Sequence, residues 1–208
     1  MNRPIVKITS FTPKLQNTKM PEYVLDKEFE HIVYKRDELN HFEFEACTFI
    51  DCNFSACNFH DISFIDCNFT RCNFSKAQIN HVKFRNVFFD FCQFKEVNFA
   101  MCDQLIFQIR FDNCNLDFAK MYALNLKQCR FYNSSLIAVD FMKADVSGIA
   151  FKKCDLYRAE FEQANAQKCD FSLSTNYTIN PQLTKIKKAI FSLEGAKGLL
   201  SHHKIIVE

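Results

Sequence analysis

The chain has little glycine or proline and lacks the short motifs that mark many catalytic sites. Its 208 residues include only 3 Gly and 4 Pro. No glycine-rich phosphate loop, G-x-S-x-G turn, H-E-x-x-H helix or D-x-D-x-D-G calcium loop occurs in the sequence. We therefore expect no catalytic residues, no bound metal and no cofactor, and we do not expect an enzyme.

A strong excess of one charge and a long apolar run are also absent. The 26 basic and 24 acidic side chains nearly balance, which argues against a strongly basic nucleic-acid binder and against a strongly acidic DNA mimic. No apolar run approaches the roughly 20 residues of a membrane span. The opening MNRPIVKITSF lacks the apolar core of a signal peptide. We expect a cytoplasmic protein that binds neither membranes nor nucleic acid directly.

Phenylalanine, in contrast, is abundant, and it recurs with a period of five. The chain has 25 Phe, and from Phe44 to Phe99 every fifth residue is large and apolar, with Phe at all but one of these twelve positions. The register shifts by two residues near 100–105, and a second series of fourteen positions runs from Ile106 to Phe171. An α-helix repeats every ~3.6 residues and a strand every second residue, so neither explains this spacing.

The residue two before each central position is small or slim, as in Cys47, Cys52 and Cys57. The other three positions of each five are mostly polar, so two residues face a core and three face solvent. A chain that turns once per five residues closes a square coil every four repeats. Such coils stack by strand pairing about 4.8 Å apart, and the 26 counted repeats predict a rod roughly 30 Å long.

All eleven Cys fall in the inward position two before a centre. Their C-x-x-x-x-C spacing differs from the C-x-x-C spacing of a zinc site, and we expect them to be small buried hydrophobes. A redox sensor built on this ladder would need exposed thiols of low pKa. Six His are expected on the surface without a shared metal: His31, His41, His60, His81, His202 and His203.

The segments CNFSACNF, CNFTRCNF and CDLYRAEF resemble the A/C-(D/N)-(L/F)-X-X motif of the pentapeptide repeat family. The resemblance covers roughly residues 40–173 and is specific, because the register persists over more than twenty repeats. It implies an all-β fold, a right-handed quadrilateral parallel β-helix. The tail NYTINPQLTKIKKAIFSLEGAKGLL resembles the C-terminal module of a bacterial subgroup of this family.

Quinolone-resistance pentapeptide proteins, more distantly similar, bind DNA gyrase and topoisomerase IV by resembling DNA in shape and charge. They dimerise through a C-terminal helix and often carry loops extruded from the coil. Here the only interruption is the two-residue slip, and residues 42–173 hold 16 acidic and 14 basic side chains. Mimicry of DNA needs one long negative stripe. Here an acidic start is followed by a basic stretch: Glu43, Glu45, Asp51, Asp61 and Asp66, then Arg71, Lys76, Lys83 and Arg85.

Several large apolar residues fall where the register demands solvent. Cross-strand ladders of aromatic residues stabilise any sheet, but an exposed apolar patch also marks a binding surface. The candidate partner-binding residues are Phe88, Phe91, Tyr122, Tyr132, Ile137, Met142 and Tyr157.

The register divides the chain into three segments. Residues 1–41 form an N-terminal cap with weak repeats, residues 42–173 form the β-helix, and residues 174–208 form a C-terminal helical capping and dimerisation module. Caps are needed because a solenoid otherwise exposes its core and its strand edges at both ends.

The C-terminal module is predicted to start with a short helix. Asn180 is placed as its N-cap and Pro181 as its first residue, Gly195 and Gly198 end or bend the segment after this helix, and KIIVE reads as a final strand. Candidate cap or dimer residues are Leu183, Ile186, Ile190, Leu199 and Leu200.

Two hypotheses remain from the sequence. The first is a non-catalytic interaction scaffold for an unknown protein partner, with a homodimer through the C-terminal module. The second is a protector or inhibitor of a type II topoisomerase that mimics DNA. They differ in electrostatics, because only mimicry requires a continuous negative surface.

Overall fold

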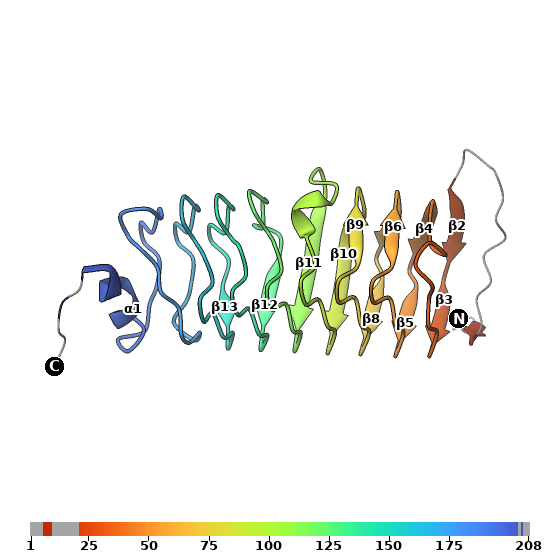
Figure 1. Cartoon of the computed structure of the whole chain (residues 1–208), viewed down its shortest axis with the longest axis horizontal. Helices are drawn as coiled ribbons and strands as arrows, with labels where there is room; N and C mark the ends of the chain where they lie inside the picture. Colours follow the sequence, from red (N-terminus) through yellow and green to blue (C-terminus); the bar gives the residue numbers. More distant parts are fainter. Residues whose placement is uncertain (1–5, 10–20, 204, 206–208) are drawn as a thin grey trace, which may run out of the picture.

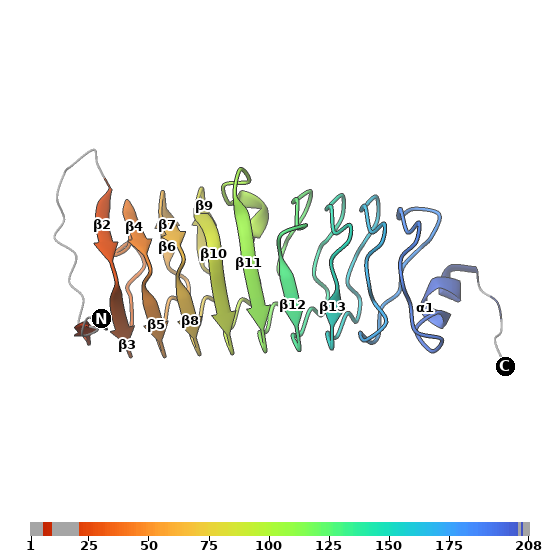
Figure 2. The ribbon, with the colours of Figure 1, turned by 180° about the vertical axis from the view of Figure 1, so that it is seen from behind.

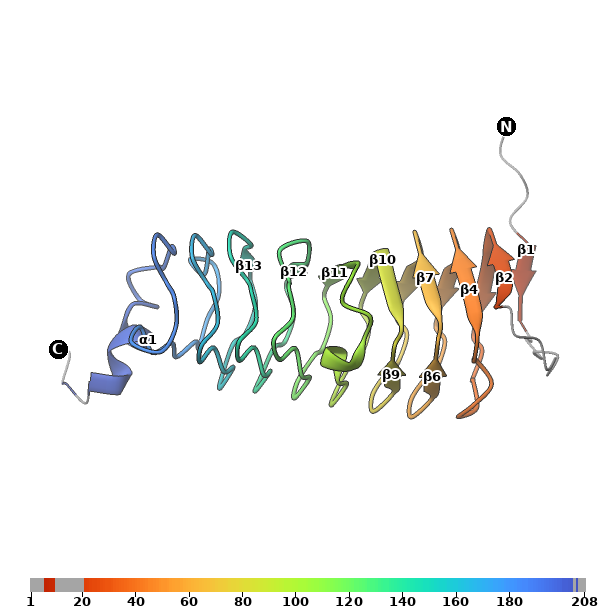
Figure 3. The same cartoon turned by 90° about the horizontal axis from the view of Figure 1, so that it is seen from above.

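A computed structural model describes residues 6–9, 21–203 and 205, which wind into a rod of stacked coils (Figure 1). Each coil has four sides, which we number as faces 1 to 4, and each side has one inward residue at its centre. Viewed from above, the coils follow one another in sequence order towards the C-terminal helix (Figure 3). The chain is therefore a right-handed quadrilateral parallel β-helix, as predicted.

The central residues of each face form a column along the rod. Face 1 holds Phe29, Phe49, Phe69, Phe89, Phe111, Phe131, Phe151, Phe171 and Phe191; face 2 holds Tyr34, Phe54, Phe74, Phe94, Leu116, Leu136 and Leu156. Face 3 holds Leu39, Phe59, Ile79, Phe99, Met121, Phe141 and Phe161; face 4 holds Val24, Phe44, Phe64, Phe84, Phe107, Leu126, Val146, Ala166 and Ile186.

Short parallel strands form where a side of one coil pairs with the same side of the next, and Figure 2 shows one such row from β3 to β13. Face 1 carries β1 (Val6–Ile8), β3 (Lys27–Glu30), β5 (Thr48–Ile50), β8 (Asn68–Thr70), β12 (Arg130–Tyr132) and β13 (Phe151–Lys152), and β11 (Phe107–Asp112) begins on face 4 and continues onto face 1. Face 4 carries β2 (Glu22–Leu25), β4 (Phe42–Glu45) and β7 (Ser63–Ile65), β10 (Lys83–Asp90) spans faces 4 and 1, and face 3 carries β6 (Asn58–His60) and β9 (Gln78–Asn80).

Aromatic rings stack along each column at about the coil spacing. The ring centroids of Phe49 and Phe69 lie 4.6 Å apart with planes 4° from parallel, and those of Phe171 and Phe191 lie 5.3 Å apart at 3°. Rings on adjacent faces meet edge-on, as Phe44 and Phe49 do at 79°. Each such pair contributes about 0.5–1.5 kcal/mol beyond the area that it buries, so the columns hold successive coils together.

Each coil turns at corner residues whose φ is positive, and few of them are glycine. Twenty-six non-glycine residues have φ between 46° and 63°. None is Val, Ile or Thr, because a β-branched side chain strains this conformation. The corner amides are paired with the next coil, as Asp51 N donates to Thr70 O at 3.0 Å and Arg71 N donates to Asp90 O at 2.9 Å. These left-handed corners were not predicted from the sequence.

The Asn and Asp that precede many centres shape the backbone locally. The Asn53 Oδ1 accepts from Ser55 N at 3.0 Å, and the Asp140 Oδ1 accepts from Met142 N at 2.9 Å. Such a side chain mimics a backbone turn. The second position of the motif is therefore structural as well as solvent-facing.

Between β10 and β11, a short 3-10 helix, η1 (Phe99–Met101), and the loop after it accommodate a register shift. Val87 pairs with Ile109, 22 residues later, whereas Phe49 pairs with Phe69, 20 residues later. The assignment of Ile106 as a centre is wrong, because Ile106 is 46% exposed. Its neighbour Phe107, 5% exposed, fills face 4 instead.

The helix predicted from Asn180 and Pro181 is also wrong, because the coil continues through these residues. Lys185 pairs with Asn165 in a parallel bridge, and the Thr184 hydroxyl donates to Phe161 O at 2.9 Å. The five-residue period keeps small or apolar residues inward here, which a helix would not. The only α-helix in the described residues is α1 (Lys197–Leu200), followed by the 3-10 helix η2 (Ser201–His203).

Gly195 and Gly198 allow the tail to approach the last coil closely. A Cβ at Gly195 would lie 1.7 Å from Tyr177 Oη, and a Cβ at Gly198 would lie 2.1 Å from Tyr177 O. These glycines therefore serve packing, whereas the prediction had them ending or bending the segment after the predicted helix. Of the predicted KIIVE strand, Ile205 is exposed and not in a strand, and residues 204 and 206–208 lie outside the described residues.

At the other end, strand pairing begins before residue 42. β2 pairs with β4 and β1 pairs with β3, in register from Glu22 with Phe42 and from Val6 with Lys27. Ile8 packs against the core. The first strand thus lies across the end of face 1, and residues 1–5 and 10–20 of the expected cap lie outside the described residues.

Candidate partner-binding surface

The interior of the rod is filled by side chains. Twelve of its largest fully buried side chains are Phe, including Phe49 and Phe69. Hollows of 230 to 660 Å³ lie on the outer surface. Within residues 6–9, 21–203 and 205, no helix is long and apolar enough to cross a membrane. Contacts with other molecules must therefore be made by outward side chains.

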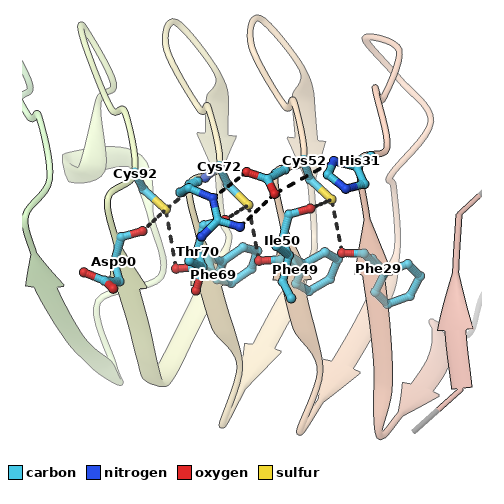
Figure 4. Close-up of polar contacts among 12 residues, drawn as sticks. Phe29, His31, Phe49, Ile50, Cys52, Phe69, Thr70, Cys72, Asp90 and Cys92 are labelled. Carbon is cyan, nitrogen blue, oxygen red and sulfur yellow. Dashed lines mark hydrogen bonds and ion pairs between the residues drawn. The ribbon is translucent and has the colours of Figure 1, made fainter.

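The eleven Cys are buried and unbridged, and each fills an inward position. The Sγ atoms of Cys52, Cys72 and Cys92 donate to the carbonyl oxygens of Phe29, Phe49 and Phe69 at 3.4–3.5 Å, in a ladder along the rod (Figure 4). The hydroxyl of Ser174 makes the same contact with Phe151 O at 2.6 Å. The position therefore favours a small side chain that donates to the coil before it.

Burial favours the protonated form of most of these thiols, although a hydrogen bond with Cys67 lowers the pKa of Cys47. Desolvation raises the pKa of Cys57 and of Cys154 to about 11, and that of Cys129 to about 12. Desolvation also raises the pKa of Cys72 and Cys102. A redox sensor needs exposed thiols of low pKa, so the ladder is a structural feature.

Three of the seven candidate partner-binding residues lie on or beside face 1. Phe91 occupies a corner and is 55% exposed, Tyr132 on β12 is 38% exposed, and Phe88 on β10 is half-buried. The Arg110 guanidinium lies 4.9 Å from the centre of the Phe88 ring, and Lys153 Nζ lies 5.6 Å from that of Tyr132. Neighbouring cations therefore cover part of these rings.

Two further candidates lie at the edge between faces 2 and 3, together with Phe118, which was not among the predicted residues. Tyr157 is 54% exposed, Ile137 is half-buried, and Phe118 is 50% exposed. They occupy three successive coils, because Phe118 N donates to Ile137 O and Ala138 N donates to Tyr157 O. We call Phe118, Ile137 and Tyr157 the Phe118 ridge. Phe118 could have been found from the register, since it lies two residues after a centre.

Tyr122 and Met142 lie on successive coils at the far end of face 3. Tyr122 is 37% exposed with Lys143 Nζ 5.2 Å from its ring centre, and Met142 is half-buried. Faces 1 and 3 are opposite sides of a square coil, so the seven candidates do not form one patch. The structure places them in three groups.

The candidate dimer residues separate into two kinds. Leu183, Ile190 and Leu200 are 47%, 54% and 38% exposed, whereas Ile186 and Leu199 pack against the core. The first three therefore remain available to a partner, and the last two hold the tail on the rod.

Three histidines come together, although they are far apart in the sequence. The ring centroids of His41 and His60 lie 6.1 Å apart and those of His60 and His81 lie 6.2 Å apart. Asp61 Oδ2 lies 3.8 Å from His41 Nδ1 and 3.7 Å from His60 Nε2. All four side chains are exposed, and no three His, Cys, Asp or Glu in the described part of the chain are arranged to hold a metal ion.

Charges that are distant in sequence neutralise each other across coils. Arg71 donates to Asp51 through Nε at 2.7 Å and Nη2 at 2.8 Å, twenty residues apart. The Asp51 pKa is lowered by this hydrogen bond. The acidic start and the basic stretch seen in the sequence are therefore partly interleaved on the surface.

Comparison with known proteins supports the repeat assignment. The family model described as pentapeptide repeats matches in 8 copies, over residues 47–86, 72–103 and 109–148. No curated protein sequence matches the chain.

Among solved structures, two trypsin-treated forms of QnrB1, described as a plasmid-mediated fluoroquinolone resistance protein, have a similar fold. The first aligns with a TM-score of 0.60 and 17% identity over 90% of this chain and 99% of that chain. The second aligns with a TM-score of 0.51 and 19% identity over 91% of this chain and 99% of that chain. With its five-residue period, its square coils and its buried Cys and Phe columns, the chain belongs to the pentapeptide repeat family.

Proposed function

We propose that the protein is a non-catalytic interaction scaffold that binds a protein partner on its outer faces. The Phe118 ridge is the observation that carries this proposal. Most outward positions are polar, yet three successive coils place Phe118, Ile137 and Tyr157 on one edge, with two of them at least half exposed. Aromatic side chains on a rigid support are favoured at the centres of protein interfaces.

The rod itself suits this role better than it suits catalysis. Its interior is filled, and its hollows lie open on the outer surface, whereas a small-molecule site is usually an enclosed pocket that buries most of its ligand. Residues in the corners are fixed by backbone bonds to the next coil, as at Phe118, whose N–H donates to Ile137 O at 2.9 Å. A backbone held in this way loses little freedom when the surface binds a partner.

The test is affinity capture from a lysate of the source organism with the purified full chain and two matched variants. In the first variant, Phe118→Ser and Tyr157→Ser remove the exposed rings of the ridge. In the second, Phe91→Ser and Tyr132→Ser remove two exposed rings beside face 1. We expect the ridge variant to lose a partner that the wild type and the second variant retain, with affinity reduced about tenfold or more. Equal retention by all three proteins would reject the ridge as the binding site.

We also propose a homodimer through the C-terminal end. Leu183, Ile190 and Leu200 are exposed there, and Leu193 is 93% exposed. Light scattering should give the dimer mass for the wild type and the monomer mass for a variant with Leu183→Ser and Leu193→Ser. A wild-type mass equal to that of the monomer at high concentration would refute the dimer.

Action on a type II topoisomerase is the second candidate. It is supported by the likeness of fold to QnrB1 over almost the whole of that chain, at a TM-score of 0.60. The interleaved charges weigh against DNA mimicry. The direct test is a gyrase supercoiling assay with ciprofloxacin present, to which the purified protein is added in increasing amounts. Rescue of supercoiling, or inhibition without drug, would favour this candidate over the scaffold with a different partner.

A reducing compartment such as the cytoplasm fits the cysteines. All eleven are free and buried, and free thiols persist where glutathione and thioredoxin keep them reduced. We propose the cytoplasm as the location, to be tested by cell fractionation.

A further inference from the structure

A groove rich in basic side chains runs along the edge between faces 4 and 1, away from the Phe118 ridge. Two adjoining hollows of 660 and 570 Å³ share Arg110, Lys127 and Arg130 in their linings, and the second adds Lys152. We call these four side chains and the hollows between them the Arg130 groove. They come from three successive coils, because Arg110 pairs with Arg130 and Tyr132 pairs with Lys152.

Two of the four cations are already neutralised. Arg110 donates to Asp112 through Nε at 3.0 Å and Nη2 at 2.5 Å, and Lys127 Nζ lies 2.9 Å from Asp145 Oδ2. Arg130 and Lys152 are exposed and have no carboxylate within ion-pair distance among residues 6–9, 21–203 and 205. Arg130 lies directly opposite Arg110, whose charge is satisfied by Asp112. The charge left for an added anion is therefore that of Arg130 and Lys152.

The floor of the groove is kept open by Gly148. Glycine is not needed there for the turn, since 26 other residues in the described part of the chain adopt positive φ without it. Nor is glycine needed for packing, because a Cβ at Gly148 would meet no heavy atom within 4 Å. The next corner along the rod, Lys168, carries a long side chain with φ of 59°. The absence of a side chain at 148 therefore has one visible effect, which is to leave space beside Arg130 and Lys152.

We propose that the Arg130 groove binds a short acidic segment of a protein partner through its Asp or Glu carboxylates. Arginine suits this role because its guanidinium can hold a carboxylate by two hydrogen bonds. The three coils span about 10 Å at the usual strand spacing, which an extended peptide covers in about three residues. This inference rests on the proposed scaffold function, because it names the chemistry of the partner.

The shortness of the groove favours an acidic peptide over a nucleic-acid backbone. Towards the N-terminus, the same edge carries Asp66 and Glu45 as well as Arg85, and towards the C-terminus it carries Asp170 as well as Lys168. A continuous phosphate backbone laid along this edge would meet these carboxylates. A peptide with two or three acidic side chains would end before it reached them.

The test is fluorescence anisotropy of a fluorescein-labelled hexaglutamate peptide with the purified full chain at low salt. Hexaglutamine and a six-residue oligothymidylate are the comparison probes. We expect hexaglutamate to bind, hexaglutamine not to bind, and binding to weaken as salt screens the charges. No binding of hexaglutamate at millimolar protein, or tighter binding of the oligothymidylate, would overturn the proposal.

Four variants locate the site. Arg130→Gln with Lys152→Gln should weaken binding about tenfold, the effect of losing roughly 1.4 kcal/mol. The control variant, Lys120→Gln with Arg158→Gln, removes the same charge from exposed positions elsewhere. It should change the affinity for hexaglutamate by less than about twofold. Gly148→Gln should weaken binding by filling the floor. Asp145→Asn should strengthen it by releasing Lys127 while keeping the local turn, since Asn165 makes the same turn one coil later.

An equal loss in the control pair would mean that only net charge matters and would reject the site. Folding of each variant is checked by its thermal midpoint. If lysate capture depends on the Phe118 ridge and hexaglutamate does not bind, the groove fails while the scaffold stands. If hexaglutamate binds as predicted and no partner is captured, the scaffold fails.

Discussion

The two halves of the rod build the same coil from different residues. Residues 22–99 contain 15 Phe and form strands on three faces, whereas residues 107–191 contain 9 Phe and form strands on face 1 and, at the start of β11, on face 4, with turns and single bridges elsewhere. Leu116, Leu136 and Leu156 replace Phe on face 2 without changing the coil spacing. The spacing of inward residues therefore sets the architecture, and the coil forms whether Phe or Leu fills a column.

The halves also differ in charge. Residues 22–99 hold 13 acidic and 8 basic side chains, a net charge of −5, whereas residues 107–191 hold 8 acidic and 12 basic side chains, a net charge of +4. A chain that is nearly neutral overall is thus acidic at one end and basic at the other. The basic half can then attract an acidic partner that the acidic half repels. This agrees with the proposal of an acidic ligand in the Arg130 groove.

The largest expected effect comes from emptying an aromatic column. Phe69→Ala should lower the free energy of unfolding by about 3–5 kcal/mol, because it leaves a cavity between Phe49 and Phe89. Leu136→Ala in the other half should cost less, about 2–4 kcal/mol, since a smaller side chain is removed. Urea denaturation measures both. A cost below about 1 kcal/mol at Phe69 would show that the register is wrong.

The next effect distinguishes the glycine of the groove from those of the tail. Gly198→Ala should cost about 1–3 kcal/mol, because its Cβ would overlap Tyr177 O at 2.1 Å. Gly148→Ala should cost about 1 kcal/mol, since a side chain at a φ of 74° is strained but meets no neighbouring atom, and Ala46, Ala56 and other alanines already occupy such corners. Thermal denaturation of the two variants, compared with the wild type, checks the difference. Equal costs would contradict the packing role of Gly198.

A smaller effect should follow from the buried thiols at alkaline pH. A thiol in the unfolded chain loses its proton near pH 8.5, whereas burial raises the pKa of Cys57 and Cys154 to about 11. The folded state therefore keeps protons that the unfolded state releases, and stability should be constant below about pH 8.5 and fall towards pH 11. Replacing both by Ser, as at Ser174, should flatten this dependence. Denaturant midpoints at pH 7, 9 and 10 measure it.

The smallest effect is expected from Asp145 in acid. Although partial burial alone would raise its pKa, hydrogen bonds from Ser147 and Lys127 hold it at about 2. Its contribution should be present above pH 4 and be lost as the pH falls towards 2, because the unfolded carboxyl takes up its proton first. Asp145→Asn should weaken this part of the acid dependence. An unchanged acid midpoint would show that the Lys127 contact contributes nothing.

Much of the fold was predictable from the sequence because the inward residues recur at every fifth position and can be recognised one by one. The inward columns, the role of the cysteines and the square coil all follow from it. The helix at Asn180 was mispredicted because two signals conflict there. The capping residues and an apolar side favour a helix, whereas the five-residue period, which continues only weakly through Thr184 and Ile186, favours another coil. Positive φ at non-glycine corners could not be predicted, since it depends on backbone bonds between coils.

The candidate site was predicted less well. Outward apolar residues were read correctly as outward, but their grouping depends on which face each occupies and on the shift at η1. Phe118 was missed although its position was readable. The Arg130 groove was not foreseen, because it combines residues from three coils and an absent side chain at Gly148.

The most direct measurement of the central claim is site-specific photo-crosslinking in the source organism. A photoreactive phenylalanine analogue is placed at 118, at 157 and, as a control, at the exposed outward position 160 between two polar coil neighbours. The account predicts that 118 and 157 label the same protein and that 160 labels it much less. Equal labelling at all three positions, or none at 118 and 157, would contradict a scaffold that binds through the Phe118 ridge.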